Sequence, residues 1–335
     1  QIFIAMSESQ FQALSDAVQE RNVTKVKKLL KQGRSVLSPA GTFSLFHVAA
    51  QIGDVDIIRA ISASASASDA SAADVNTPTK DGGTPVFVAA QEGHVDAINA
   101  LCALGADVNT PNMNGSTPVY VAASNGHVDT INALYVLGAD VRNPNKNGAT
   151  PVYVAASHGY VDTINALYAL GADVNAPDKD GDTPVLLAAQ NGHVGAIKAL
   201  FALGVDINTP NKNGSTPVLV AVQEGHVDAI NALCALGADV NTPNKNGSTP
   251  VLMAAQKGNV DAIKALCTLG ADVNTSNKDG YTPVFVAAYN GHVDAIKALC
   301  SLGADGNTPA KNGCTPVLMA ASHGYVDAIN ALGAL

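Results

Sequence analysis

DVNTPNKNGSTPVLMAAQKGNVDAIKALCTLGA, residues 239–271, is a 33-residue unit that recurs along most of the chain. The tripeptide Thr-Pro-Val marks each regular copy, and successive copies are 33 residues apart with no insertion between them. The copies begin at Thr84, Thr117, Thr150, Thr183, Thr216, Thr249, Thr282 and Thr315. A constant period of this length is the sequence signature of a fold built from stacked repeats.

Each unit predicts two short helices and a loop. Thr249 can accept a free backbone N–H at a helix start, and Pro250 suits the first helical turn. Gly258 can end this helix, because it adopts a left-handed conformation without steric penalty. Residues 260–269 carry apolar side chains at helical spacing, and residues 272–280 predict an extended arm with a tight turn. Two helices this short cannot bury their apolar faces alone, so neighbouring units must stack.

The unit resembles the ankyrin repeat, whose pattern T-P-L-H-x-A-A, then G-H, then L-L-x-x-G-A-D-V-N, is matched over nearly the whole chain. The resemblance implies an all-α solenoid of about ten stacked helix–turn–helix units with hairpin-like loops. It also implies a scaffold that binds a protein or peptide on its concave surface.

One departure from the ankyrin pattern concerns the histidine of the first helix, which links neighbouring loops by hydrogen bonds in that family. Only His47 keeps it. The regular repeats carry Phe87, Tyr120, Tyr153, Leu186, Leu219, Leu252, Phe285 and Leu318 instead. We therefore expect apolar contacts to replace those hydrogen bonds.

The repeat pattern divides the chain into three segments. Residues 1–61 are expected to form an N-terminal capping region with two divergent ankyrin repeats, the first of them rich in charge. Residues 62–73 form a Ser/Ala-rich insertion, expected to be a loop or a frayed helical extension, and residues 74–335 hold eight regular repeats. No polar capping helix ends the sequence, which suggests that further repeats follow or that a partner covers this end; we favour the former.

The composition narrows the classes of partner. The formal net charge of −9 argues against nucleic acid as the partner, and no apolar run is long enough to span a membrane. Four of the five cysteines occupy the same place in different repeats, so we expect small buried thiols in a cytoplasmic protein, without disulfides or a metal. No catalytic or cofactor-binding motif occurs, so the chain is not expected to be an enzyme or to hold a cofactor.

Two other functions fit the sequence. The array could be the part of a larger enzyme that recruits its substrate, or of a secreted effector that recruits a target in the host cytosol; the catalytic part would then lie outside this chain. It could also be a mechanical spacer without a specific ligand. The sequence assigns no oligomeric state.

Positions that vary between repeats are candidates for partner binding, because packing does not dictate them. They are the residue before the Thr and the two residues after Ala-Ala, which the resemblance places on the concave face. Tyr281 and Tyr289 fall in one repeat and could anchor a ligand, although they could equally be exposed tyrosines without a role. The other candidates of this class are Ser124, Asn125, His158, Lys257 and Asn290.

A lysine recurs at the expected loop tips, with Lys245 and Lys278 as the central examples. The column comprises Lys80, Lys146, Lys179, Lys212, Lys245, Lys278 and Lys311, and Met113 interrupts it. An acidic, extended partner could bind along this rim, or the lysines could be ordinary solvated turn residues.

Histidines follow the glycine between the two helices in five repeats: His94, His127, His193, His226 and His292. None has a companion carboxylate or cysteine in the repeat pattern that would indicate catalysis. We expect a structural role for them.

Overall fold

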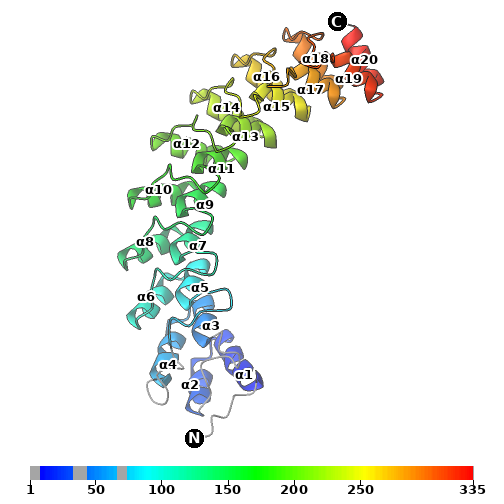
Figure 1. Ribbon diagram of the computed structural model, residues 1–335. Coiled ribbons are helices and arrows are strands. Elements are labelled where there is room, and N and C mark those ends of the chain that lie inside the picture. The colour runs from blue at the N-terminus through cyan, green and yellow to red at the C-terminus, as the bar shows by residue number, and fades with distance from the viewer. Residues whose placement is uncertain (1–7, 33–43, 66–73, 335) are drawn as a thin grey trace. The chain divides into compact units, whose positions relative to one another are not determined.

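The computed structural model describes residues 8–32, 44–65 and 74–334. The regular elements in these ranges are α-helices, and they come in antiparallel pairs joined by short loops (Figure 1). The chain divides into two compact units, Gln1–Ala155 with Asp162–Asp173, and Ala156–Val161 with Val174–Leu335. The all-α repeat fold expected from the sequence is confirmed.

The first unit is built from two layers of helices. The odd-numbered helices form one layer, in which α1 packs on α3, α3 on α5 and α5 on α7; α2, α4, α6 and α8 form the other in the same way. The helices are α1 (Glu8–Gln19), α2 (Val23–Lys31), α3 (Leu45–Ile52), α4 (Val55–Ala65), α5 (Pro85–Glu92), α6 (Val95–Ala103), α7 (Pro118–Ser124), α8 (Val128–Val136) and α10 (Val161–Ala169). The division between the units passes through α9 (Pro151–Ser157).

The second unit repeats this two-layer arrangement. Helices α11, α13, α15, α17 and α19 pack in sequence, and so do α12, α14, α16, α18 and α20. Their bounds are α11 (Pro184–Gln190), α12 (Val194–Ala202), α13 (Pro217–Glu224), α14 (Val227–Ala235), α15 (Pro250–Lys257), α16 (Val260–Thr268), α17 (Pro283–Tyr289), α18 (Val293–Ser301), α19 (Pro316–Ser322) and α20 (Val326–Gly333).

The helix ends follow the expected chemistry. The hydroxyl of Thr249 accepts a hydrogen bond of 3.3 Å from the Leu252 N–H, and Pro250 opens α15. Gly258 ends the helix with a φ of +69°, in the left-handed region. A Cβ on Gly258 would also lie 2.8 Å from the ring of His292 in the next repeat. Glycine is therefore required twice here, by the backbone conformation and by a neighbouring side chain.

The core of the regular repeats combines alanines and larger apolar residues of the first helix with aliphatic residues of the second. In the repeat that spans α15 and α16, Ala254 and Ala255 are fully buried, as are Ile263 and Leu266. Small side chains let neighbouring first helices approach closely, and each buried Ile or Leu stabilises the stack by roughly 1.5–3 kcal/mol.

Two kinds of contact link neighbouring repeats. Leu252 and most of its counterparts at the position of His47 are buried, and hydrogen bonds from other histidines accompany this packing. The histidines that follow the inter-helix glycines form hydrogen bonds between repeats through Nε2. His94 binds the carbonyl oxygen of Gln51 at 3.0 Å, and His127 binds that of Gln91 at 3.0 Å. The histidines of these repeats are structural, as expected.

Two further histidines of the second unit make the same contact. His193 Nε2 binds the carbonyl oxygen of Ser157 at 3.0 Å, and His292 Nε2 binds that of Gln256 at 3.1 Å. Because a backbone carbonyl accepts each of these bonds, the ties do not depend on the side chain of the preceding repeat.

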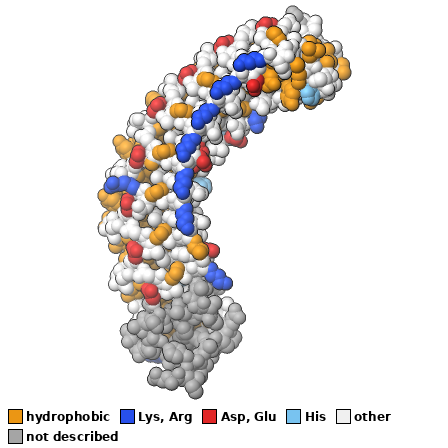
Figure 2. All heavy atoms as spheres, viewed as in Figure 1, with side chains coloured by type: hydrophobic (Ala, Val, Ile, Leu, Met, Phe, Trp, Pro, Cys, Tyr) orange, Lys and Arg blue, Asp and Glu red, His pale blue; other side chains and the backbone are white. Residues whose placement is uncertain are grey.

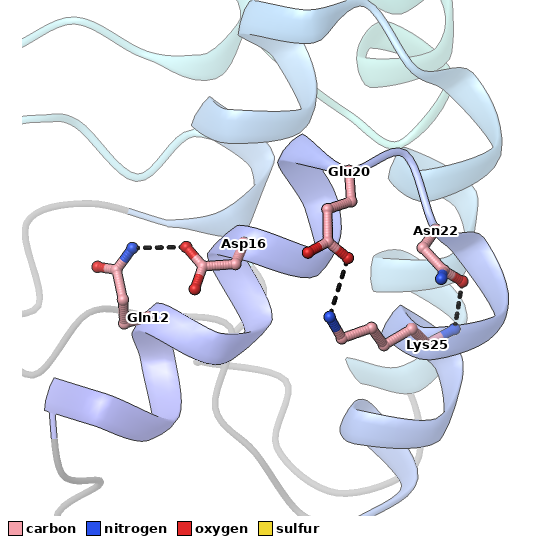
Figure 3. A network of polar contacts seen from close by, with 5 residues as sticks. All are labelled: Gln12, Asp16, Glu20, Asn22 and Lys25. Atoms are coloured by element: carbon pink, nitrogen blue, oxygen red, sulfur yellow. Dashed lines mark hydrogen bonds and ion pairs between the residues drawn. The ribbon is translucent and has the colours of Figure 1, made fainter.

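The N-terminal helix pair carries exposed polar contacts (Figure 3). Gln12 donates to Asp16 at 2.8 Å, and Lys25 pairs with Glu20 at 2.9 Å. Asn22 Oδ1 accepts a hydrogen bond from the Lys25 N–H and caps α2. Such exposed contacts contribute less than about 1 kcal/mol each to stability. They indicate that this face of the helix pair is solvated.

The expected Ser/Ala-rich insertion is described only in part. Helix α4 continues through Ala65, so residues 62–65 are helical, and residues 66–73 lie outside the described residues. In the described part of the chain, no helix combines the length and the apolar character needed to cross a membrane.

Candidate functional site

The loops of the second unit form tight, hairpin-like fingers at residues 178–182, 211–215, 244–248, 277–281 and 310–314. In the finger 244–248, the Asn244 N–H donates to the Ser248 carbonyl at 3.0 Å and the Gly247 N–H to the Asn244 carbonyl at 2.8 Å. Asn244 Oδ1 accepts from the backbone N–H groups of Asn246 and Ser248. The finger is thus held by its own asparagine.

Backbone hydrogen bonds connect each finger to the next. The Lys245 N–H donates to the Asn213 carbonyl at 3.0 Å, and the Lys278 N–H donates to the Asn246 carbonyl at 3.1 Å. Lys212 and Lys311 make the equivalent bonds. This ladder fixes the spacing of the lysine backbones along the second unit.

The lysine side chains of these fingers are exposed. Figure 2 shows a line of Lys and Arg side chains along one edge of the second unit. Lys212 Nζ contacts the carbonyl oxygen of Lys179 in the preceding finger. Within the described ranges, none of the finger lysines forms an ion pair. Their charges are therefore available to a partner.

A cavity of about 330 Å³ lies between the α15 and α17 repeats. Tyr281 stacks on Phe285 along one side, with ring centroids 4.5 Å apart and an interplanar angle of 2°. Tyr289 is 46% exposed, and its ring makes a T-shaped contact with the ring of His323, with centroids 4.8 Å apart. Hydrophobic side chains gather at this end of the unit in Figure 2. The cavity is lined by Ser248, Leu252, Gln256, Asn277, Tyr281, Phe285, Val286, Tyr289 and Asn290.

Three of the nine predicted binding residues line this cavity: Tyr281, Tyr289 and Asn290. Lys257 directly follows the lining residue Gln256 and is exposed. Lys245 and Lys278 belong to the two fingers that contribute Ser248, Asn277 and Tyr281 to the cavity. Six of the predicted residues therefore lie in or next to one site.

The other three predicted residues are elsewhere. Ser124 and Asn125 belong to the first unit, where Asn125 Nδ2 donates to the Val121 carbonyl of its own helix at 2.8 Å. His158 is exposed in another repeat, where its ring stacks on Tyr160 at 5.7 Å. These residues are not part of the cavity.

Sequence reasoning placed Ser248 only in the general class of variable positions, and it missed Phe285 and Asn277. Phe285 occupies a position that is buried in most repeats, so the sequence pattern predicts a core residue there and not a binding residue. Ser248 and Asn277 stand 29 residues apart and line the same cavity only because one finger stacks on the next. The signal that could have found them is the similarity of the pair Asp182 and Asn211, which has the same spacing and is hydrogen-bonded.

The cysteines differ in part from the expectation of buried thiols. All five are free and half-buried. Burial raises the pKa of the Cys102 and Cys234 thiols to about 11, and Asp107 adds to the rise at Cys102. Burial also raises the pKa of Cys267 and Cys300. These thiols are poor nucleophiles near neutral pH.

A larger cavity, of about 710 Å³, lies in the first unit between α4 and α6. Four of its five charged residues make polar contacts within the first unit. Arg21 donates to the Ile52 carbonyl at 2.8 Å, Asp54 caps α4 through the Ile57 N–H, and Arg59 lies 3.8 Å from Asp56. Its lining holds no aromatic side chain, unlike that of the cavity between α15 and α17.

Comparisons with known proteins agree with the fold. A family model for ankyrin repeats (3 copies) matches residues 14–112, 105–178, 170–244 and 251–334. Among solved structures, the crystal structure of the human ASB11 ankyrin repeat domain is similar, with 30% sequence identity and a TM-score of 0.59. That similarity covers 65% of this chain and 97% of the ASB11 domain. No curated protein matches the chain.

Proposed function

Because the chain belongs to the ankyrin-repeat family, whose members are generally protein–protein interaction modules, we propose that its second unit binds a segment of a partner protein in the cavity between α15 and α17. The observation that carries the proposal is the grouping of Tyr281, Phe285 and Tyr289 around one cavity with amide side chains at its edge. Tyrosine is favoured at the centres of interfaces because it combines a large apolar area with a polar end.

The size of the cavity suits one large apolar side chain of the partner. Its volume of about 330 Å³ is at the lower end of the range for ligand pockets. Burial of one such side chain contributes roughly 1.5–3 kcal/mol, which is too little for stable binding after the cost of association. A partner segment must therefore also make contacts outside the cavity.

The proposal includes no catalytic step for this chain. All five thiols are free, which suits a reducing compartment, and we place the interaction in the cytoplasm.

The test uses two substitutions that other repeats already carry. Tyr281→Ser reproduces Ser215 and Ser248, and Tyr289→Gln reproduces Gln223 and Gln256, so neither should disturb the fold. The intact chain is used to select binders from a random peptide display library. Peptides that use the cavity should lose at least about tenfold in affinity for the doubly substituted chain.

The matched control is Tyr135→Ala, which removes a tyrosine of nearly equal exposure (45%) from the first unit. It should leave the affinity of the same peptides unchanged. If no peptide is enriched, or if all enriched peptides bind the doubly substituted chain as well as the original, the proposal is wrong.

A further inference from the structure

The fingers of the second unit already bind one carboxylate of the chain itself. Asn211 Nδ2 donates a hydrogen bond of 2.7 Å to Oδ1 of Asp182, which lies at the base of the preceding finger. The two residues are 29 positions apart, a spacing that the 33-residue period reproduces in the neighbouring repeats. The geometry of stacked fingers can therefore hold a carboxylate between them.

The equivalent place at the cavity has no carboxylate. Ser248 stands where Asp182 does, and Asn277 stands where Asn211 does; both line the cavity. Asn277 Oδ1 accepts hydrogen bonds from the backbone N–H groups of Asp279 and Tyr281, each at 3.0 Å. Its Nδ2 has no hydrogen-bond partner among the residues that the structure describes. A ligand carboxylate could take the place that the Asp182 side chain fills in the other repeat.

The charges around this place favour a carboxylate more than those around Asp182 do. Burial raises the pKa of Asp182, and the nearby Asp178 and Asp180 raise it further, although the Asn211 hydrogen bond lowers it. At the cavity, Asn244 and Asn246 stand in the positions of those two aspartates. The like-charge repulsion is therefore absent from the finger 244–248.

Three exposed lysines are close in sequence to residues that line the cavity. Lys245 and Lys278 are at the tips of the two fingers, and Lys257 follows the lining residue Gln256. Asp279 is the single acidic residue in the two fingers, and it is exposed. The local field is thus positive in a chain whose formal net charge is −9.

A second place of the same kind lies one repeat earlier. Ser215 and Asn244 repeat the pair, and Lys212 and Lys245 stand at the tips of their fingers. Stacked helices are about 8–10 Å apart, which an extended peptide covers in about three residues. Two acidic side chains with two residues between them could therefore occupy both places.

We infer that the partner segment is an extended acidic peptide, which places one carboxylate between Ser248 and Asn277, a second between Ser215 and Asn244, and a neighbouring apolar side chain in the cavity beside Tyr281. This inference rests on the proposed function, because it assumes that a peptide occupies the cavity. It adds the chemical class of the segment and the spacing of its charges.

The first test examines the peptides selected from the display library that depend on Tyr281 and Tyr289. They should be enriched in Asp and Glu at positions three apart, next to an apolar residue. Peptides that depend on the tyrosines but are neutral or basic would refute the acidic class and leave the proposed function intact. Loss of the tyrosine dependence itself would refute the proposed function.

The second test puts a carboxylate of the chain itself between the fingers 244–248 and 277–281. Ser248→Asp should position its carboxylate near Asn277, as Asp182 does near Asn211, and exclude the carboxylate of a selected acidic peptide, weakening binding about tenfold. Gly195→Asp is the control for added charge: it lies in α12 of the second-helix layer, where the other regular repeats carry Asp. It should change the affinity less than twofold. Equal effects of the two substitutions would overturn the inference.

The third test concerns the cations. Lys278→Met copies Met113, the residue that another finger tip already holds, and should weaken the selected peptide about threefold at low salt. Binding should also weaken as salt rises from about 0.1 to 0.5 M. An oligothymidine probe that binds as tightly as the peptide and loses affinity with Ser248→Asp would indicate a nucleic-acid site and overturn the peptide assignment.

Discussion

His47 shows how a single side chain links two repeats and responds to pH. Its Nδ1 accepts a hydrogen bond of 3.0 Å from the Ser44 N–H, so its Nε2 carries the proton and donates to the Gly83 carbonyl at 3.1 Å. The imidazole is buried, and burial lowers its pKa from the ordinary value of 6.5. The folded state therefore binds this proton less readily than the unfolded state does.

At this residue scale, the free energy of unfolding should decrease as the pH falls below 6.5 toward the lowered pKa of His47. His47→Leu, which copies the buried Leu252 and Leu219, should remove this part of the pH dependence. The measurement is the free energy of unfolding of both proteins, obtained from urea denaturation at several pH values between about 8 and about 5. An unchanged slope in His47→Leu would show that other groups cause it.

At the scale of the element, the start of each second helix decides how firmly a repeat is tied to its predecessor. His127 packs its ring against Gly93 and binds the Gln91 carbonyl, but its side chain does not cap α8. Asn259, at the equivalent position of another repeat, does cap its helix: its Oδ1 accepts a hydrogen bond of 3.0 Å from the Ala262 N–H at the start of α16. Histidine at this position therefore stabilises the contact between repeats, whereas asparagine stabilises the start of the second helix.

This comparison predicts the order of two substitutions at one position. His127→Ala loses the hydrogen bond and the ring contact, and should lower the free energy of unfolding by about 1–2 kcal/mol. His127→Asn should cost about half as much, because asparagine can cap α8 as Asn259 caps α16. Chemical denaturation of the two variants gives the order, and an equal loss in both would contradict the capping argument.

At the scale of the whole molecule, stability should be distributed repeat by repeat. Helix α16 packs on α14 and α18, and Leu266 in α16 is fully buried. Leu266→Ala should cost about 2–5 kcal/mol through the lost apolar contacts and the cavity that remains. In a chain of nearest-neighbour contacts, this loss should be local.

Hydrogen exchange detected by mass spectrometry can measure that locality. In Leu266→Ala, amide protection should fall most in α14 to α18 and remain nearly unchanged in α1 to α4. In the matched variant Leu134→Ala, in α8 of the first unit, protection should fall most in α6 to α8 and remain nearly unchanged in α14 to α18. A uniform loss of protection along the chain in either variant would mean that the repeats unfold as one cooperative body.

The paired helices, their stacking and their ends could all be predicted from the amino-acid pattern. Thr249, Pro250 and Gly258 act locally, through capping, a preset φ and a left-handed turn, so their roles follow from the sequence of one repeat. The 33-residue period then shows that the same unit recurs and must stack. Tyr281 and Tyr289 could be predicted as one group for the same reason, since a single repeat carries both.

Which distant residues line the cavity, and which carbonyls the inter-helix histidines bind, follow from the packing of one repeat on the next. Ser248 and Asn277 come from successive repeats and line one cavity, and His292 binds the Gln256 carbonyl of the preceding repeat. Such pairs depend on how one repeat packs on the next, and similar residue types recur in several units. Their identity therefore reveals little until stacking sets the distance between them.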